Sequence, residues 1–172
     1  VKMQQIVFDI PGSGPAALDL KRVVAAGYTG RDRHLVDEHI RELESMGVAP
    51  PKHVPMLFPL MPTLVTTADE IAPLGLDSTP EVEFVLFRTM GFDYVTVGSD
   101  HTDRRIEAQS VALAKNVWPK PIARSAWPLN AVRGHWDKLV LKAACEGETL
   151  QEGPLSMIMT PEDLQAFVTQ HD

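Results

Sequence analysis

The stretch that decides the fold is residues 81–100, EVEFVLFRTMGFDYVTVGSD. Residues 82–87 and 94–97 are runs of apolar, β-branched and aromatic side chains, and the segment between them contains Gly91. Two such runs joined by a short glycine-containing segment are typical of a β-hairpin. We therefore predict two antiparallel strands here, with acidic residues before the first strand and after the second.

The residues on both sides of this hairpin predict more strand than helix. Short apolar runs indicate strands at residues 5–10, 23–26, 56–58, 122–126 and 139–144. Apolar spacing and capping residues indicate helices at residues 35–46, 103–115 and 161–171, of which the second is expected to be capped by Thr102. The 14 prolines favour strands and ordered loops over long helices. The prediction is a single α+β, β-dominated domain over residues 1–172.

The composition narrows the classes of partner. The formal net charge is −7, which opposes binding to nucleic acid because non-specific affinity for phosphates comes from clustered Lys and Arg. Cys145 is the single cysteine, so no internal disulfide can form. The apolar runs are shorter than a membrane span, and the first residues lack the apolar stretch of a signal peptide. We expect a cytoplasmic protein with a small-molecule partner and no membrane or nucleic-acid partner.

Glu81 and Glu83 stand at the head of the first hairpin strand. Because side chains alternate along a strand, both carboxylates point to the same face. Paired anions on an apolar strand need compensation, and their oxygens suit Mg²⁺, Mn²⁺ or Ca²⁺. The alternative is a solvated strand end after Pro80, where surface carboxylates are common.

The segment at residues 99–104, SDHTDR, follows the second strand and adds a third carboxylate. A capped turn would explain the presence of Thr102 and Asp103, but it would not explain the presence of Asp100. Loops at strand ends often carry function. We therefore predict that Glu81, Glu83 and Asp100 bind one divalent cation, Mg²⁺ or alternatively Mn²⁺ or Ca²⁺.

The order of these motifs resembles the fumarylacetoacetate hydrolase-like superfamily and, within it, a bacterial branch. The matching positions are Gly27 to Asp32, then Glu81-Val82-Glu83, then Asp100, Thr102 and Arg104, and finally Lys115 ahead of Trp118 to Pro121. The sequence departs from the pattern at Ser99, Arg105 and Arg33, which stand where the family has asparagine, aspartate and the catalytic histidine. The family also continues into glycine-rich strands, so either a C-terminal segment is lacking or the sheet closes differently here.

The resemblance implies a curved mixed sheet or β-roll with short helices at its mouth, and a homodimer. It implies a metal-dependent hydrolase that cleaves a C–C bond in an acylpyruvate-type 2-oxo acid or 1,3-dicarbonyl compound, with a metal-stabilised enolate. Two alternatives stay open. One is a hydratase, decarboxylase or tautomerase acting on a related 2-oxo acid, and the other is a catalytically inactive, metal-stabilised binding protein.

The resemblance also assigns roles to individual residues. Lys115 is expected to pair with the substrate carboxylate or a developing oxyanion, and the residues expected to bind substrate are His101, Thr102 and Arg104. Arg33 occupies the catalytic position, but a slip of one residue places His34 there. Asp37 or Glu38 would then orient His34 as a general base. The alternative is an exposed His34, with Arg33 paired to Asp37.

Overall fold

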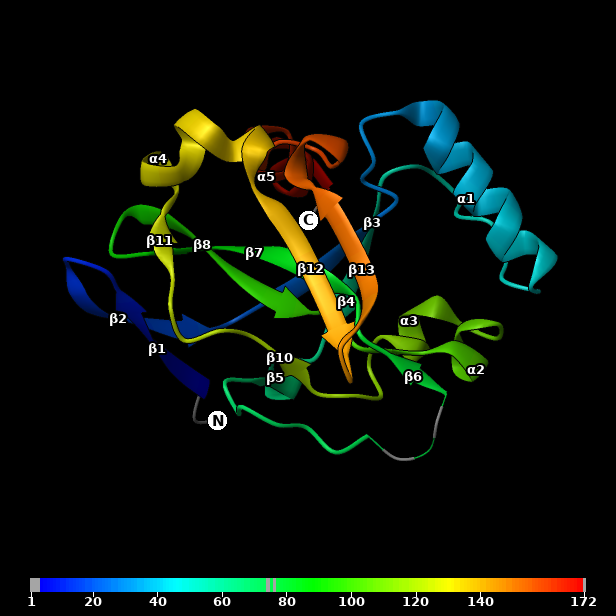
Figure 1. The fold of residues 1–172 in the computed structure, drawn as a ribbon, viewed down its shortest axis with the longest axis horizontal. Helices are drawn as coiled ribbons and strands as arrows, with labels where there is room; N and C mark the ends of the chain where they lie inside the picture. Colours follow the sequence, from blue (N-terminus) through cyan, green and yellow to red (C-terminus); the bar gives the residue numbers. More distant parts are fainter. Residues whose placement is uncertain (1–3, 74, 76, 172) are drawn as a thin grey trace.

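The computed structural model describes residues 4–73, 75 and 77–171, which form a mixed α+β, β-dominated structure (Figure 1). The main strands are β1 (Gln4–Ile10), β2 (Gly14–Leu20), β3 (Val23–Gly27), β4 (Met56–Leu60), β7 (Val82–Thr89), β8 (Phe92–Ser99), β12 (Val140–Cys145) and β13 (Glu148–Pro154). The two-residue strands are β5 (Val65–Thr66), β6 (Ser78–Thr79), β9 (Thr102–Asp103), β10 (Lys120–Pro121) and β11 (Trp127–Pro128). The helices are α1 (Arg33–Ser45), α2 (Arg104–Glu107), α3 (Val111–Ala114), α4 (Leu129–Val132) and α5 (Pro161–His171), with 3₁₀ turns η1 (Pro62–Leu64), η2 (Arg133–Lys138) and η3 (Leu155–Met157).

The predicted hairpin is confirmed as β7 and β8, which pair antiparallel from Val82 opposite Ser99 to Thr89 opposite Phe92. Met90 and Gly91 make the turn, and both have positive φ (52° and 81°). Two consecutive left-handed residues give a turn whose twist matches that of the strands. Gly91 adopts this conformation without steric cost.

The two faces of this hairpin pack against different cores. Phe87 and Tyr94 face a cluster around the fully buried Phe8 of β1, and the Phe8 and Phe87 rings are stacked with centroids 4.2 Å apart. Phe84 and Val95 face the opposite cluster, which is built on Trp136 and also contains Leu129 and Leu155. Because each strand of the hairpin alternates between two apolar environments, its register is strongly specified.

The other strands form small sheets rather than one curved sheet. Among the residues that the structure describes, β11 joins the hairpin, and the remaining strands form the pairs β1–β2, β3–β4, β5–β10, β6–β9 and β12–β13. Only β5 and β10 run parallel within that part of the chain. The expected single curved sheet is therefore replaced by several short ones, although the mixed, β-dominated class is confirmed.

Two predicted elements differ from the structure. The helix expected at residues 103–115 is divided into α2 and α3, because the Ser110 side chain accepts a hydrogen bond from Leu113 N and begins a new helix. Asp103, and not Thr102, caps α2. Residues 122–126 do not form a named strand, since their backbone amides reach three different neighbours: Thr66, Val97 and Asp9.

The predicted helix ends are better reproduced. Asp32 caps α1 by accepting a hydrogen bond from His34 N, and Gly47 follows the helix with φ of +90°. Thr160 accepts from Asp163 N at the start of α5 (3.1 Å). Among the described residues, no helix is both long enough and apolar enough to cross a membrane.

Candidate functional site

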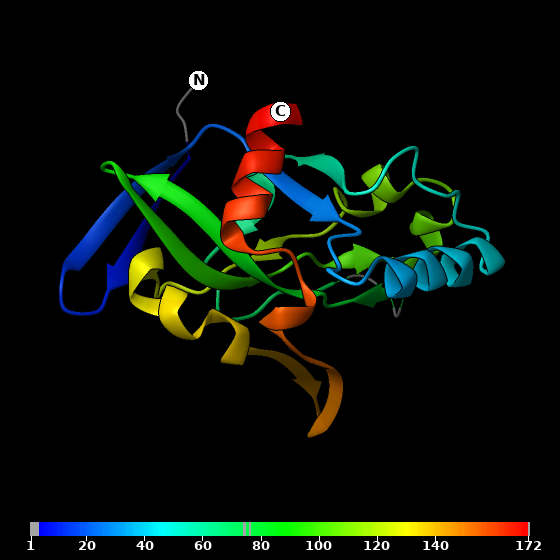
Figure 2. The ribbon, with the colours of Figure 1, turned by 90° about the horizontal axis from the view of Figure 1, so that it is seen from above.

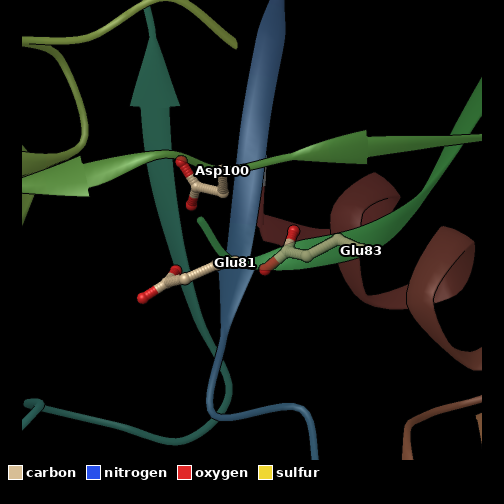
Figure 3. A group of neighbouring side chains, drawn as sticks. All are labelled: Glu81, Glu83 and Asp100. Atoms are coloured by element: carbon tan, nitrogen blue, oxygen red, sulfur yellow. The ribbon is translucent and has the colours of Figure 1, made fainter. Parts of the chain in front are cut away.

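The three predicted carboxylates lie together at one end of the β7–β8 hairpin (Figure 3). Glu83 is directly opposite Gly98, and the Asp100 amide donates to the Glu81 carbonyl (2.9 Å), so the ladder continues one step beyond the strands. Residues opposite each other in a ladder share a face. One ligand atom from each of Glu81, Glu83 and Asp100 lies within 4.8 Å of the other two.

Gly98 leaves the space that this arrangement needs. A Cβ atom at Gly98 would lie 2.9 Å from Ile122 Cγ2, 3.0 Å from the Pro121 carbonyl oxygen and 3.0 Å from Val85 Cγ2. The backbone oxygen cannot move aside as a flexible side chain would. A glycine is therefore required for the segment after β10 to approach β8 beside Glu83.

Two lysines hold Asp100 between them. Lys115 Nζ lies 2.6 Å from Asp100 Oδ2 and 2.9 Å from Glu81 Oε2, and Lys120 Nζ lies 2.7 Å from Asp100 Oδ1. Asp100 and both lysines are buried. Burial alone would lower the pKa of Lys115, but Glu81 and Asp100 raise it above its usual value. The pKa of Lys120 is lowered, since its burial outweighs the attraction of Asp100.

Arg104 closes the exposed side of the cluster. Its guanidinium contacts Glu81 Oε1 and Glu107 Oε2, each at 2.7 Å, and its side chain is 42% exposed. Arg104 therefore has donors both inside the cluster and toward solvent. The contact of Arg104 with substrate stays a prediction.

Glu83 differs from its two neighbours because no ion pair to it is present among the described residues. Burial, followed by the negative charge of Asp100, raises the pKa of Glu83 from 4.5 to about 8. Glu81 and Asp100 are already paired with cations, whereas the Glu83 carboxylate is stabilised by none directly. A cation placed against Glu83 would relieve this cost.

The donor set fits a hard divalent cation. Ligand distances of about 2.0–2.6 Å allow one ion to touch oxygens that are up to about 5 Å apart, and the three carboxylates meet that condition at 4.8 Å. A carboxylate has several lone-pair sites, so an oxygen that accepts from a lysine can still bind a metal. The lysines nevertheless compete with a metal ion for the negative charge of the carboxylates.

Two of the predicted substrate-binding residues lie inside the protein. Thr102 is fully buried and donates to the Asp100 carbonyl (2.7 Å), and its contact with substrate stays a prediction. His101 is 8% exposed, no described residue forms a hydrogen bond with its Nε2, and Lys120 donates to its carbonyl. Burial, helped by Lys120, lowers the pKa of His101. Both residues shape the loop that carries Asp100.

The predicted acid–base residues lie on the first turns of α1. Arg33 Nε is 2.9 Å from Asp37 Oδ1, and His34 Nε2 is 3.2 Å from Glu38 Oε1. The His34 side chain is 74% exposed. Within the described residues no hydrogen bond or ion pair joins Arg33, His34 or Glu38 to the carboxylate cluster. Both expected pairs therefore exist, and the role of His34 as a base stays a prediction.

Sequence reasoning missed three residues beside the cluster. The only sequence signal for Lys120 is that it follows shortly after Lys115. Glu107 has the sequence context of an ordinary helix residue. Gln151 comes from β13, and its amide binds both backbone groups of Val82, which separates the two glutamates. Nothing in the sequence around Gln151 indicates this contact.

Comparison with known proteins corrects the suggested relationship. Residues 26–172 match the family described as protein of unknown function DUF2848. The resemblance to the fumarylacetoacetate hydrolase-like superfamily is therefore wrong; it rested on short motifs, such as Glu-x-Glu at a strand start, that unrelated folds also contain. No match is found among curated proteins. Since the match spans most of the sequence, the chain belongs to the DUF2848 family.

Proposed function

We propose that the protein is an enzyme that depends on a divalent cation, Mg²⁺ or Mn²⁺, and acts on a small 2-oxo acid or 1,3-dicarbonyl compound. The observation that carries the proposal is the convergence of Glu81, Glu83 and Asp100 within 4.8 Å, while no described residue forms an ion pair with Glu83. Without an ion, the elevated pKa of Glu83 is a cost that gives the fold no benefit. Perturbed carboxylates of this kind are enriched at functional sites.

The residues around the carboxylates favour an anionic substrate. When bound, the cation would supply a Lewis acid for negative charge that develops on a substrate oxygen. Lys115 carries a fixed positive charge next to the same position, because its raised pKa keeps it protonated. Arg104 can turn part of its guanidinium toward a substrate carboxylate, since 42% of its side chain is exposed.

Stabilising negative charge on two neighbouring oxygens serves several reactions. C–C bond hydrolysis of an acylpyruvate is the first reaction to test, and decarboxylation, hydration or tautomerisation of a related 2-oxo acid is the second, because an enolate is common to them. The water or base that completes the reaction is proposed to involve His34, oriented by Glu38. The small-molecule substrate, a homodimer and a cytoplasmic location are proposed with this function.

The second candidate is a protein without catalysis whose carboxylate cluster is held together by its own lysines and arginine rather than by a metal ion. It is favoured by one observation: Lys115, Lys120 and Arg104 already supply three positive charges to the cluster. Buried ion pairs of this type can exist for structural reasons alone. In that case the carboxylates would bind no divalent ion at physiological concentrations.

Titration with Mn²⁺ separates the two candidates. We expect the native protein to bind one Mn²⁺, and Glu83→Gln to lose most of that affinity. Glu162→Gln is a matched control, because Glu162 forms an exposed ion pair with Arg133 away from the cluster. A native protein that binds no Mn²⁺ would overturn the proposal. Acylpyruvates and oxaloacetate with Mg²⁺ or Mn²⁺ would then be assayed for turnover.

A further inference from the structure

A cavity of about 610 Å³ lies between the start of α1, residues 54–55 and α5. Figure 2 shows α5 standing beside β3, whose chain continues into α1. The apolar lining consists of Val36, Val54, Pro55, Met159, Ala166 and Phe167. Asp163, Ala166, Phe167 and Gln170 also line the cavity and follow helical spacing, so α5 presents one continuous face to it.

Three charged side chains at the edge of the cavity already have partners. Arg31 binds Asp137 (2.6 Å), Arg33 binds Asp37 (2.9 Å), and Asp163 accepts from the Thr160 hydroxyl (2.7 Å). A ligand in this cavity therefore gains little from these charges. The surface that it would cover is mainly apolar side chain.

Tyr28 belongs to this cavity, and its pKa responds to charges at the carboxylate cluster. It lines the cavity, and its φ of +60° is uncommon for a large side chain. Residues held in that region often belong to functional sites. Burial, followed by the negative charge of Glu107, raises the pKa of Tyr28, with a smaller contribution from Glu81, which is a member of the cluster.

A short series of contacts runs from Gly27, the neighbour of Tyr28, to the predicted metal ligands. The neighbouring Gly27 packs so closely on Phe58 that a Cβ atom there would lie 2.8 Å from the ring. The Phe58 ring centroid is 5.9 Å from Lys115 Nζ, and Lys115 contacts both Glu81 and Asp100. Two buried side chains, Phe58 and Lys115, thus link Gly27 to the carboxylates.

We propose that this cavity holds the apolar end of the substrate while the two-oxygen end lies at the carboxylate cluster. This inference rests on the proposed function and deepens it. The substrate class is then a 2-oxo acid with an apolar substituent of several carbons, rather than one of pyruvate size. Phe167 and Ala166 on α5 would contact the substituent, and Tyr28 would lie at the junction of the two ends.

The test is calorimetric binding, in the presence of Mn²⁺, of oxalate and of pyruvate, 2-oxobutanoate, 2-oxohexanoate and 2-oxooctanoate. Each buried methylene should tighten binding by roughly threefold to fourfold. Ala166→Trp fills the cavity and should remove this increase while oxalate still binds. Thr169→Trp is the matched control on the same helix, because Thr169 is exposed and does not line the cavity. Phe167→Ala, which enlarges the cavity, should weaken only the longer acids.

The outcomes separate this inference from the function on which it rests. Binding of oxalate and pyruvate without any effect of chain length would overturn the cavity assignment and leave the proposed function intact. An equal loss of the chain-length effect in Thr169→Trp and Ala166→Trp would also overturn it. Absence of Mn²⁺ and oxalate binding would refute the proposed function, and the inference with it.

Discussion

The side-chain amide of Gln151 binds both backbone groups of Val82: Val82 N donates to Gln151 Oε1 (2.8 Å), and Gln151 Nε2 donates to the Val82 carbonyl (3.1 Å). Among the described strands β7 lies at the edge of its sheet, so no described strand pairs with these two groups. The amide of Gln151 takes the place of a missing strand residue. Because Val82 lies between Glu81 and Glu83, the contact fixes the backbone that carries both carboxylates.

Gln151→Ala is predicted to weaken metal binding more than it weakens the fold. Each of the two lost hydrogen bonds contributes about 0.5–1.5 kcal/mol, and the exposed Val82 groups can bind water instead. We expect a small decrease in the urea midpoint and a several-fold loss of Mn²⁺ affinity, because the two glutamates become less well ordered. Urea unfolding measures the midpoint and Mn²⁺ titration measures the affinity, both on the same variant.

The control is Glu152→Ala, one residue further along β13, which removes only an exposed ion pair with Lys142. Its Mn²⁺ affinity should equal that of the native protein. If the two variants bind Mn²⁺ equally well, Gln151 does not position the ligands.

The hairpin and its carboxylates were predictable because the information is local. Alternation along one strand places Glu81 and Glu83 on one face, and the short turn at Gly91 fixes the register that brings Asp100 opposite Glu81. A two-residue turn leaves little freedom to the strands that it joins. The convergence of the three carboxylates follows from these two facts.

The shortest strands and the long-range contacts could not be predicted, because they do not arise from the local sequence. Strands such as β6 and β9 have two residues each and carry no periodic pattern; they exist because Thr79 meets Thr102 across the chain. Gln151 reaches Val82 from 69 residues away. Such contacts depend on tertiary packing, and no motif in the sequence predicts them.

Metal affinity is predicted to rise with pH up to about 8. In the metal-free protein Glu83 keeps its proton below a pKa of about 8, so a cation must displace that proton in order to bind. Affinity should then increase about tenfold for each pH unit below 8 and level off above it. Mn²⁺ titrations at pH 6, 7, 8 and 9 measure this, and Glu83→Gln should abolish the slope.

The same group affects the stability of the metal-free protein. The folded pKa of Glu83 is raised, so the protonated form is favoured in the fold. The stability that Glu83 contributes is complete below its unfolded pKa of 4.5 and is lost as pH rises through about 8. Saturating Mn²⁺ should remove this loss, and an unfolding midpoint that declines equally with and without Mn²⁺ would contradict the assignment.

Gly98→Ala is predicted to destabilise the protein by about 1–3 kcal/mol, the usual cost of overpacking. The added methyl group would lie 3.0 Å from the Pro121 carbonyl oxygen and push the segment after β10 away from β8. Gly134→Ala is the control, because a Cβ there meets nothing within 4 Å. Urea unfolding should show a clear loss for Gly98→Ala and little change for Gly134→Ala.

Lys115→Met distinguishes a metal site from a cluster whose carboxylates are compensated by lysines alone. Lys115 contacts Glu81 and the buried Asp100, so its removal leaves two carboxylates with less compensation. Loss of one partner from a buried ion pair typically costs about 3–5 kcal/mol, and we expect the metal-free variant to be destabilised on that order. The variant should also lose turnover of any substrate found, because the positive charge that Lys115 places beside the developing negative charge on the substrate is removed.

The decisive measurement is the recovery of Lys115→Met by Mn²⁺. If the carboxylates bind a divalent cation, the ion can replace the missing positive charge, and Mn²⁺ should raise the melting temperature of the variant by more than it raises that of the native protein. Lys142→Met, which removes an exposed pair with Glu152, is the control and should respond to Mn²⁺ as the native protein does. A destabilised Lys115→Met that Mn²⁺ does not rescue would show that the lysines, and not a metal, hold this cluster together.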